Sequence, residues 1–188
     1  MLLLFSNNLQ PSTAAAASSL INPSKTFIKT SCKKTSYPNV CYSSLSPYAP
    51  IVGTNLRKLV TVSLNVALKT AKNTSSAISK ISKQKGLKKV EAAVVRDCVE
   101  NVKDSIYEMR LCVKGLGNGS KKRIGKETME SIKTWMSAAI TDEETCMDGF
   151  QGQKVKASVQ SSIRKYMVKL VMVTSNALAI IDLLPTYS

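Results

Sequence analysis

The feature that most constrains this chain is a hydrophobic repeat with the period of an α-helix. Apolar residues in the middle of the sequence recur at alternating steps of four and three, at Val95, Val99, Val102, Ile106, Met109, Val113 and Leu116. That spacing places them all on one narrow stripe of a helix. Such a helix gains most of its stability by burying its stripe against another apolar surface, so it needs partners.

Three further segments carry the same pattern. They are Leu56, Val60, Ala67, Ala71, Ile78 and Ile81; Met129, Ile132, Met136, Ile140 and Met147; and Val159, Ile163, Tyr166, Leu170, Val173, Ala177, Ile180 and Leu184. Glycines fall between the segments, at 86, at 115, 117 and 119, and at 149 and 152. Amphipathic helices with short joins bury their stripes by antiparallel packing. We therefore predict an all-α fold, an up-down-up-down four-helix bundle over about residues 54–184.

The cysteines limit how these helices can be joined. Cys32 and Cys41 enclose a short segment containing a proline, which indicates a disulfide-closed helical hairpin at about 24–50. Cys98 and Cys112 lie on one predicted helix about 21 Å apart, whereas a disulfide requires Cα atoms within roughly 7 Å. They cannot bond to each other. If Cys32 pairs with Cys41, then Cys146 pairs with Cys98 or Cys112, and one thiol remains.

The chain contains no histidine and no Cys-x-x-Cys pair. A Ser-His-Asp triad, a Cys-His pair and a histidine-ligated metal are therefore excluded, and a tetrahedral zinc site lacks its usual ligands. A hydrolase based on two facing carboxylates is disfavoured too, because most of the acids are expected on one outer surface. We predict that the protein is not an enzyme, and that it has no catalytic residues, metal or cofactor.

Charge is distributed unevenly along the chain. The 27 Lys and Arg outnumber the 12 Asp and Glu, for a net charge of +15. Residues 1–90 contain 13 basic residues and no carboxylate, whereas residues 91–148 contain 11 of the acids. A basic polyanion-binding module is one reading of the net charge. We predict no nucleic-acid partner, since aromatic residues are only 5% of the chain and no nucleic-acid-binding motif is present.

Several features are typical of an exported protein. Residues 1–23 combine an apolar stub with a run of small residues, and we interpret them as a remnant or incomplete signal peptide and leader. Asn73 and Asn118 begin possible N-glycosylation sequons. The most apolar segment, 166–184, is interrupted by Lys169, Asn176 and Asp182, so we expect no transmembrane helix. Disulfides also indicate secretion.

Five motifs, in order, resemble the plant invertase and pectin methylesterase inhibitor family. They are Cys32-Lys-Lys-Thr-Ser-Tyr-Pro-Asn-Val-Cys41, Arg96-Asp-Cys-Val-Glu100, Thr134-Trp-Met-Ser-Ala-Ala-Ile-Thr141, Thr145-Cys-Met-Asp-Gly-Phe150 and Ser175-Asn-Ala-Leu-Ala179. The resemblance covers about residues 24–182. It implies a four-helix bundle with an N-terminal hairpin, secreted to the plant cell wall (the apoplast). It also implies disulfides Cys32–Cys41 and Cys98–Cys146, which leave Cys112 as a free thiol.

The resemblance also bears on the target enzyme. Invertase-directed members are thought to use a Pro-Lys-Phe motif between the last two helices, and here that loop reads Gly149-Phe-Gln-Gly-Gln-Lys-Val155. Tyr48-Ala-Pro50, Lys85-Gly-Leu-Lys88 and Asp142-Glu-Glu-Thr-Cys-Met-Asp-Gly-Phe150 look more like the pectin methylesterase branch. We predict a free-standing inhibitor of pectin methylesterase, forming a 1:1 complex, with inhibition of cell-wall or vacuolar invertase as the alternative.

The acids suggest where the enzyme would bind. Asp97, Glu100, Asp104 and Glu108 form a stripe opposite the apolar one. A Cys98–Cys146 bond would bring Asp142, Glu143, Glu144 and Asp148 beside that stripe. By motif match we expect enzyme contacts at Glu100, Asp104, Thr145 and Asp148. An ordinary solvated face is the alternative, which the absence of acids from the first 90 residues disfavours. The lysines of those residues suggest retention on demethylated pectin.

Overall fold

The chain folds into helices arranged as the stripes predict. The computed structural model describes residues 22–117 and 124–185. The helices are α1 (Pro23–Cys32), α2 (Pro38–Leu45), the short 3-10 helix η1 (Ser46–Tyr48), α3 (Ala49–Val52), α4 (Leu56–Ser82), α5 (Lys89–Leu116), α6 (Lys126–Asp148) and α7 (Ala157–Ile181). The all-α fold is confirmed. Most of the predicted leader and the sequon residue Asn118 lie outside the described residues.

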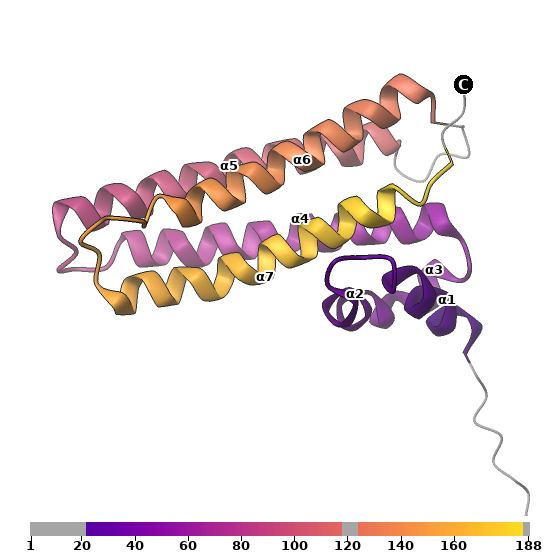
Figure 1. Cartoon of the computed structure of the whole chain (residues 1–188), viewed down its shortest axis with the longest axis horizontal. Coiled ribbons are helices and arrows are strands. Elements are labelled where there is room, and N and C mark those ends of the chain that lie inside the picture. The colour runs from indigo at the N-terminus through magenta and orange to yellow at the C-terminus, as the bar shows by residue number, and fades with distance from the viewer. Residues whose placement is uncertain (1–21, 118–123, 186–188) are drawn as a thin grey trace, which may run out of the picture.

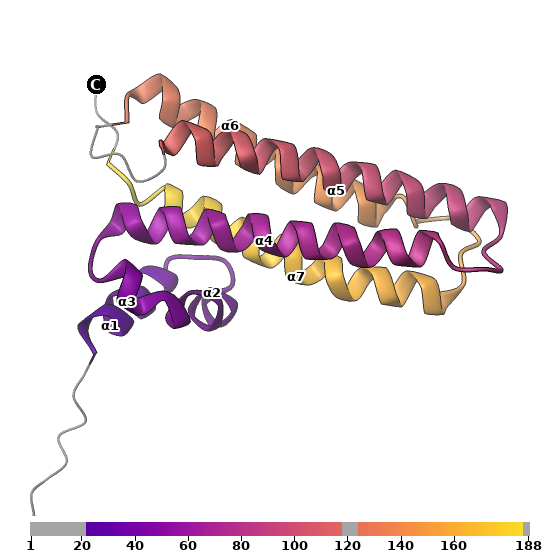
Figure 2. The same ribbon diagram turned by 180° about the vertical axis from the view of Figure 1, so that it is seen from behind.

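The four long helices pack as a bundle of two layers. Each packs against its neighbour in sequence, and α4 also packs against α7, which closes the bundle. Figures 1 and 2 show α5 and α6 side by side as one layer, over α4 and α7 as the other. The predicted up-down-up-down bundle is therefore confirmed. The helices α1 to α3 lie against one end of the α4/α7 layer (Figure 1).

The predicted stripes form the core, with one shift of register. Val95, Val102, Met109 and Leu116 are buried along α5 as expected. On α7, however, Met167 is fully buried, whereas Tyr166 is 44% exposed. Both positions follow Ile163 at a spacing compatible with one helix face. The flexible methionine fills the core, while the tyrosine keeps its hydroxyl in water, so the expectation for Tyr166 was wrong.

The N-terminal hairpin is held by a disulfide and by one buried side chain. Cys32 and Cys41 are bonded, with their Cα atoms 5.5 Å apart. The Asn176 side chain of α7 accepts a hydrogen bond from the Tyr37 N–H and donates one to the Tyr37 carbonyl, both at 3.0 Å. One side-chain amide thus forms hydrogen bonds with both the N–H and the carbonyl of Tyr37 in the hairpin turn. The predicted hairpin is confirmed, and Asn176 fixes it against the bundle.

The second disulfide joins α5 to α6. Cys98 is bonded to Cys146, which settles the choice that spacing alone left open. Cys112 is a buried free thiol whose Sγ donates to the Ile132 carbonyl at 3.4 Å. Burial, and to a lesser degree the nearby Glu108 carboxyl, raises the pKa of this thiol to about 12. Cys112 is thus protonated at neutral pH and unsuited to thiol exchange.

The two disulfides should differ in their effect on stability. Cys98 and Cys146 are 48 residues apart in sequence, against 9 for Cys32 and Cys41. A disulfide stabilises a protein by lowering the conformational entropy of the unfolded chain, and the effect grows with the length of the loop it closes. We therefore predict that Cys98→Ala with Cys146→Ala lowers the free energy of unfolding by about 4 kcal/mol. Cys32→Ala with Cys41→Ala should lower it by about 3 kcal/mol. Urea unfolding of the oxidised variants measures both. Cys112→Ala controls for losing a buried sulfur, and equal losses in all three variants would contradict the prediction.

Candidate functional site

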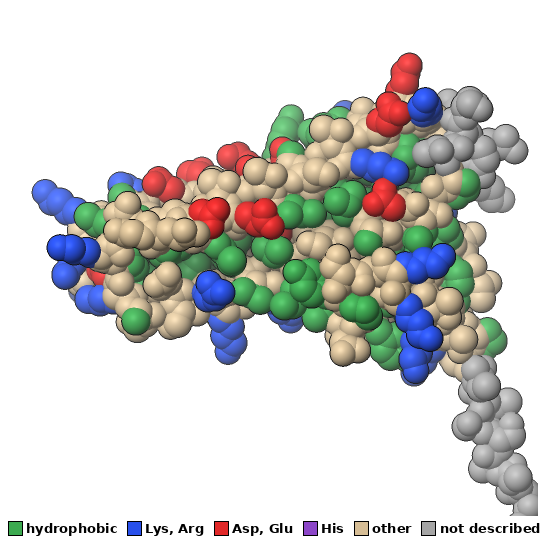
Figure 3. All heavy atoms as spheres, in the orientation of Figure 1, with side chains coloured by type: hydrophobic (Ala, Val, Ile, Leu, Met, Phe, Trp, Pro, Cys, Tyr) green, Lys and Arg blue, Asp and Glu red, His purple; other side chains and the backbone are tan. Residues whose placement is uncertain are grey.

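The bundle confines most of its acids to one helix pair, whereas its Lys and Arg side chains are divided almost evenly, seven on α5 and α6 and eight on α4 and α7. Helices α5 and α6 contain 11 of the 12 carboxylates of the chain, from Glu91 to Asp148. Helices α4 and α7 contain no carboxylate and eight Lys and Arg side chains. In Figure 3 most of the acids gather along the α5/α6 side of the molecule, and the charged side chains visible along the opposite edge are basic. The acid-rich segment of the sequence thus becomes one layer of the fold.

The predicted contact residues lie on this acid-rich layer near its covalent link. The Cys98–Cys146 disulfide and a hydrogen bond from Ser105 to Glu143 fix the register of α5 against α6. Glu100 and Asp104 lie between those two links on α5, and Thr145 and Asp148 flank Cys146 on α6. The structure therefore brings all four predicted contacts to the same level of the bundle, and all four are exposed.

Local hydrogen bonds hold three of these side chains. The Glu100 carboxylate forms an ion pair with Lys103 at 2.8 Å. The Thr145 hydroxyl donates to the Thr141 carbonyl at 2.7 Å. The Asp148 carboxylate accepts from the Gln151 amide at 2.7 Å. All three partners lie within one helical turn, so the side chains are oriented by their own segments.

A pair of carboxyl groups bridges α5 and α6 beside Asp104. Burial raises the pKa of Glu108 to about 7, and the charge of Asp142, a hydrogen bond to it and the charge of Asp104 add to the shift. The pKa of Asp142 is also raised, by burial first. Glu108 therefore keeps its proton to a higher pH than an ordinary glutamate does. We call the set Asp97, Glu100, Asp104, Glu108, Asp142 and Asp148, together with Thr145, the acidic face.

Glu143 was predicted beside the acidic stripe, and this prediction was wrong. It is completely buried, and its Oε1 accepts hydrogen bonds at 2.9 Å from Ser105 on α5 and from Thr174 on α7. Among the described residues, nothing bonds its buried Oε2. Burial raises the pKa of Glu143 to about 8, so it is neutral at pH 7. Its place three residues before Cys146 and four after Ala139 put it on the core stripe.

Glu143 should make stability depend on pH. The native state keeps a proton that the unfolded chain releases above the ordinary pKa of 4.5. Stability is thus greatest below that pH and falls as pH rises toward 8. We expect the melting temperature to drop by roughly 5 °C or more between pH 5 and pH 8.5.

Two matched variants test the origin of that drop. Glu143→Gln keeps the shape and both hydroxyl contacts but cannot ionise, so the drop should become smaller, and the part that remains is expected from Glu108 and Asp142, whose pKa values are also raised. Glu144→Gln makes the same change at an exposed neighbour, and the drop should stay. Calorimetric melting scans between pH 5 and pH 8.5 measure the drop. If the melting temperature of Glu143→Gln depended on pH as that of the parent chain does, the assignment of the drop to Glu143 would be refuted.

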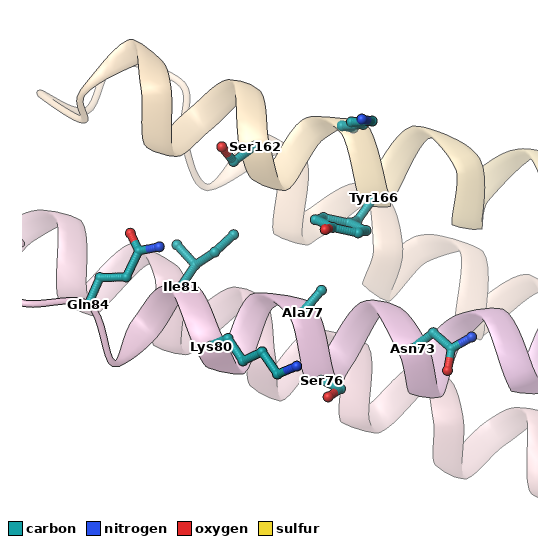
Figure 4. A pocket seen from close by; sticks show the side chains of 9 residues that line it. Asn73, Ser76, Ala77, Lys80, Ile81, Gln84, Ser162 and Tyr166 are labelled. Atoms are coloured by element: carbon teal, nitrogen blue, oxygen red, sulfur yellow. The ribbon is translucent and has the colours of Figure 1, made fainter.

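The sequence did not predict a groove on the other layer. It lies between α4 and α7, has a volume of about 620 Å³, and is lined by residues that include Lys80, Lys165 and Tyr166 (Figure 4). Asn73, the described sequon residue, is exposed and lines the same groove. The sequence pattern gave no sign of this groove, because it placed Tyr166 on the core stripe of its helix.

Two further observations concern the described residues as a set. Among these residues, no three or more His, Cys, Asp or Glu side chains lie close enough together to bind a metal ion. Within 22–117 and 124–185, no helix has the length and apolar character needed to cross a membrane.

Comparison with known proteins gives one consistent result. Residues 26–180 match the family model described as plant invertase/pectin methylesterase inhibitor. The chain is 40% identical over 159 residues to Pectinesterase inhibitor 10 of Arabidopsis thaliana, spanning 84% of this chain and half of that protein. It is 38% identical to the 21 kDa protein of Daucus carota, over 96% of this chain and 92% of the relative.

A solved structure has the same fold. A mutant form of a pectin methylesterase inhibitor from Arabidopsis superposes with a TM-score of 0.68, covering 85% of this chain and 98% of that one. The two sequences are 21% identical.

Proposed function

The chain belongs to the plant invertase/pectin methylesterase inhibitor family, and we propose that it inhibits a pectin methylesterase. The observation that carries this proposal is its 40% identity to a relative named as a pectinesterase inhibitor. The paired motif segments of α5 and α6, joined by Cys98–Cys146, support it. This chain spans about half the length of that relative, so the proposal concerns the helical domain.

The acidic face provides a mechanism for inhibition. The enzyme's substrate is a methyl-esterified polyuronate that becomes anionic as esters are removed, and its cleft must accept carboxylates and hydroxyls. We propose that Glu100, Asp104, Thr145 and Asp148 present these groups to the cleft in a 1:1 complex and so block it. Complementary potential would steer association, and buried contacts would supply the affinity.

The rigidity of this surface favours tight binding. A disulfide and the Ser105–Glu143–Thr174 hydrogen bonds fix α5 and α6 before the enzyme arrives. Little conformational entropy is then lost on association. The raised pKa of Glu108 reduces the negative charge there near neutral pH and so lowers the repulsion within the acidic face.

Secretion to the plant cell wall is part of the same proposal. Two disulfides support it, because such bonds persist in oxidising compartments.

Invertase is the second candidate target, since the family name includes it. The Gly149–Val155 loop lacks the Pro-Lys-Phe motif associated with that activity, which favours the esterase. Titrating the oxidised protein against a plant pectin methylesterase and an acid invertase in parallel distinguishes the two. Inhibition of invertase alone would overturn the proposal.

Charge reversal on the acidic face tests the mechanism. Glu100→Lys with Asp104→Lys should raise the inhibition constant at least about tenfold, because repulsive charges replace complementary ones. Thermal stability should change little, since both side chains are exposed. The readout is pectin methylesterase activity titrated with inhibitor.

A matched double variant controls for net charge. Glu127→Lys with Glu130→Lys changes the charge equally, at exposed positions about 18 Å or more along α6 from Asp142. It should inhibit like the parent chain. Equal weakening by both double variants would show that overall charge, and not the acidic face, governs binding.

A further inference from the structure

The groove between α4 and α7 has walls of unusual composition. Tyr166 projects from α7 toward Ala77 on α4, and its ring forms an exposed surface between the two helices (Figure 4). Asn73, Gln84 and Ser162 add amide and hydroxyl groups along the groove on either side of this ring (Figure 4). A volume of about 620 Å³ lies within the range of ligand-binding pockets. An aromatic surface ringed by hydrogen-bonding groups is suited to a sugar.

The charge around the groove is of one sign. Lys80 and Lys165 line it from opposite helices, both exposed. Neither α4 nor α7 contains an Asp or Glu along its length. No carboxylate lines the groove to neutralise these lysines, and the acids of α5 and α6 lie on the other layer. The potential there is therefore positive, and it favours an anionic ligand.

We propose that the α4/α7 groove binds the uronate chain of demethylated pectin, with Lys80 and Lys165 binding carboxylates and Tyr166 contacting a sugar ring. The class of ligand rests on the proposed function, because a pectin methylesterase releases such carboxylates. A polyuronate repeats a carboxylate on every sugar, so its negative charge matches lysines on both walls. The groove is open to solvent, which suits a segment of polymer better than an enclosed small molecule.

This site and the acidic face lie on opposite layers, so one molecule can bind the enzyme and the polymer together. Attachment to the product would hold the inhibitor where esterase has already acted. The local concentration of inhibitor would then rise without any new contact to the enzyme.

Calorimetric titration of the oxidised full chain tests the proposal. The probe is a short oligogalacturonide of defined length at low salt, with its fully methyl-esterified form alongside. The free acid should bind, and the methyl ester should not. Lys80→Gln with Lys165→Gln should weaken binding about fivefold or more, since two exposed charge contacts are lost. Tyr166→Ala should also weaken it, at unchanged net charge.

Lys33→Gln with Lys34→Gln is the matched control. These exposed lysines lie at the end of α1, and their loss changes the net charge equally. Binding by this variant should stay within about twofold of the parent chain. Equal weakening by both double variants would overturn the groove site in favour of general electrostatic attraction. Equal competition by single-stranded DNA of matched charge would overturn the uronate assignment.

An activity assay separates this proposal from the proposed function. On soluble substrate, Lys80→Gln with Lys165→Gln should inhibit pectin methylesterase as the parent chain does, because the acidic face is intact. Normal inhibition without oligogalacturonide binding by the parent chain would refute the groove site alone. Binding without inhibition would refute the proposed function and leave the groove site standing.

Discussion

Four narrow apolar stripes on four separate helices can be buried only against one another, and the rest of the structure follows from that constraint. Once the stripes face inward, every other position on α4 to α7 is assigned to the surface or to a helix contact. The acids of α5 and α6 then lie on one of the two layers, and the helices of the other layer contain none. The Cys98–Cys146 bond adds the register of α5 against α6, which brings the predicted contact residues to one level of the bundle.

Two fully buried glutamates show how the same side chain adopts opposite charge states. Glu91 accepts hydrogen bonds at 2.8 Å from the Lys88 and Lys156 N–H groups, at the start of α5 and of α7. Those backbone donors lower its pKa, so it stays ionised and ties two helix ends together. Glu143 receives only two hydroxyl donors in the middle of the core, and burial raises its pKa. At Glu91 the backbone donors outweigh the effect of burial on the pKa, whereas at Glu143 burial outweighs the two hydroxyl donors.

The hydrophobic period predicted the helices and the residues on their buried stripes. It failed where two neighbouring positions fit the core side of a helix equally well. The four long helices, the hairpin at Cys32–Cys41 and the burial of Val95 or Ile163 follow from spacing alone. Tyr166 and Met167 both fit the core side of α7, and only packing decides between them. Glu143 was misplaced because its charge was weighed above its position on the stripe. The α4/α7 groove depends on how two helices 80 residues apart in sequence face each other, which no local pattern specifies.

The net charge of +15 conceals two surfaces that act independently. The outer sides of the two layers are separated by about two helix diameters, roughly 20 Å. At physiological ionic strength the Debye length is about 8 Å, so lysines on α4 and α7 are largely screened from the acidic face. A bundle that mixed its charges on every helix would offer neither surface. Because the acids of the bundle helices are confined to α5 and α6, a cationic protein has both an anionic face, which we propose meets the enzyme, and a cationic groove, which we propose binds that enzyme's anionic product.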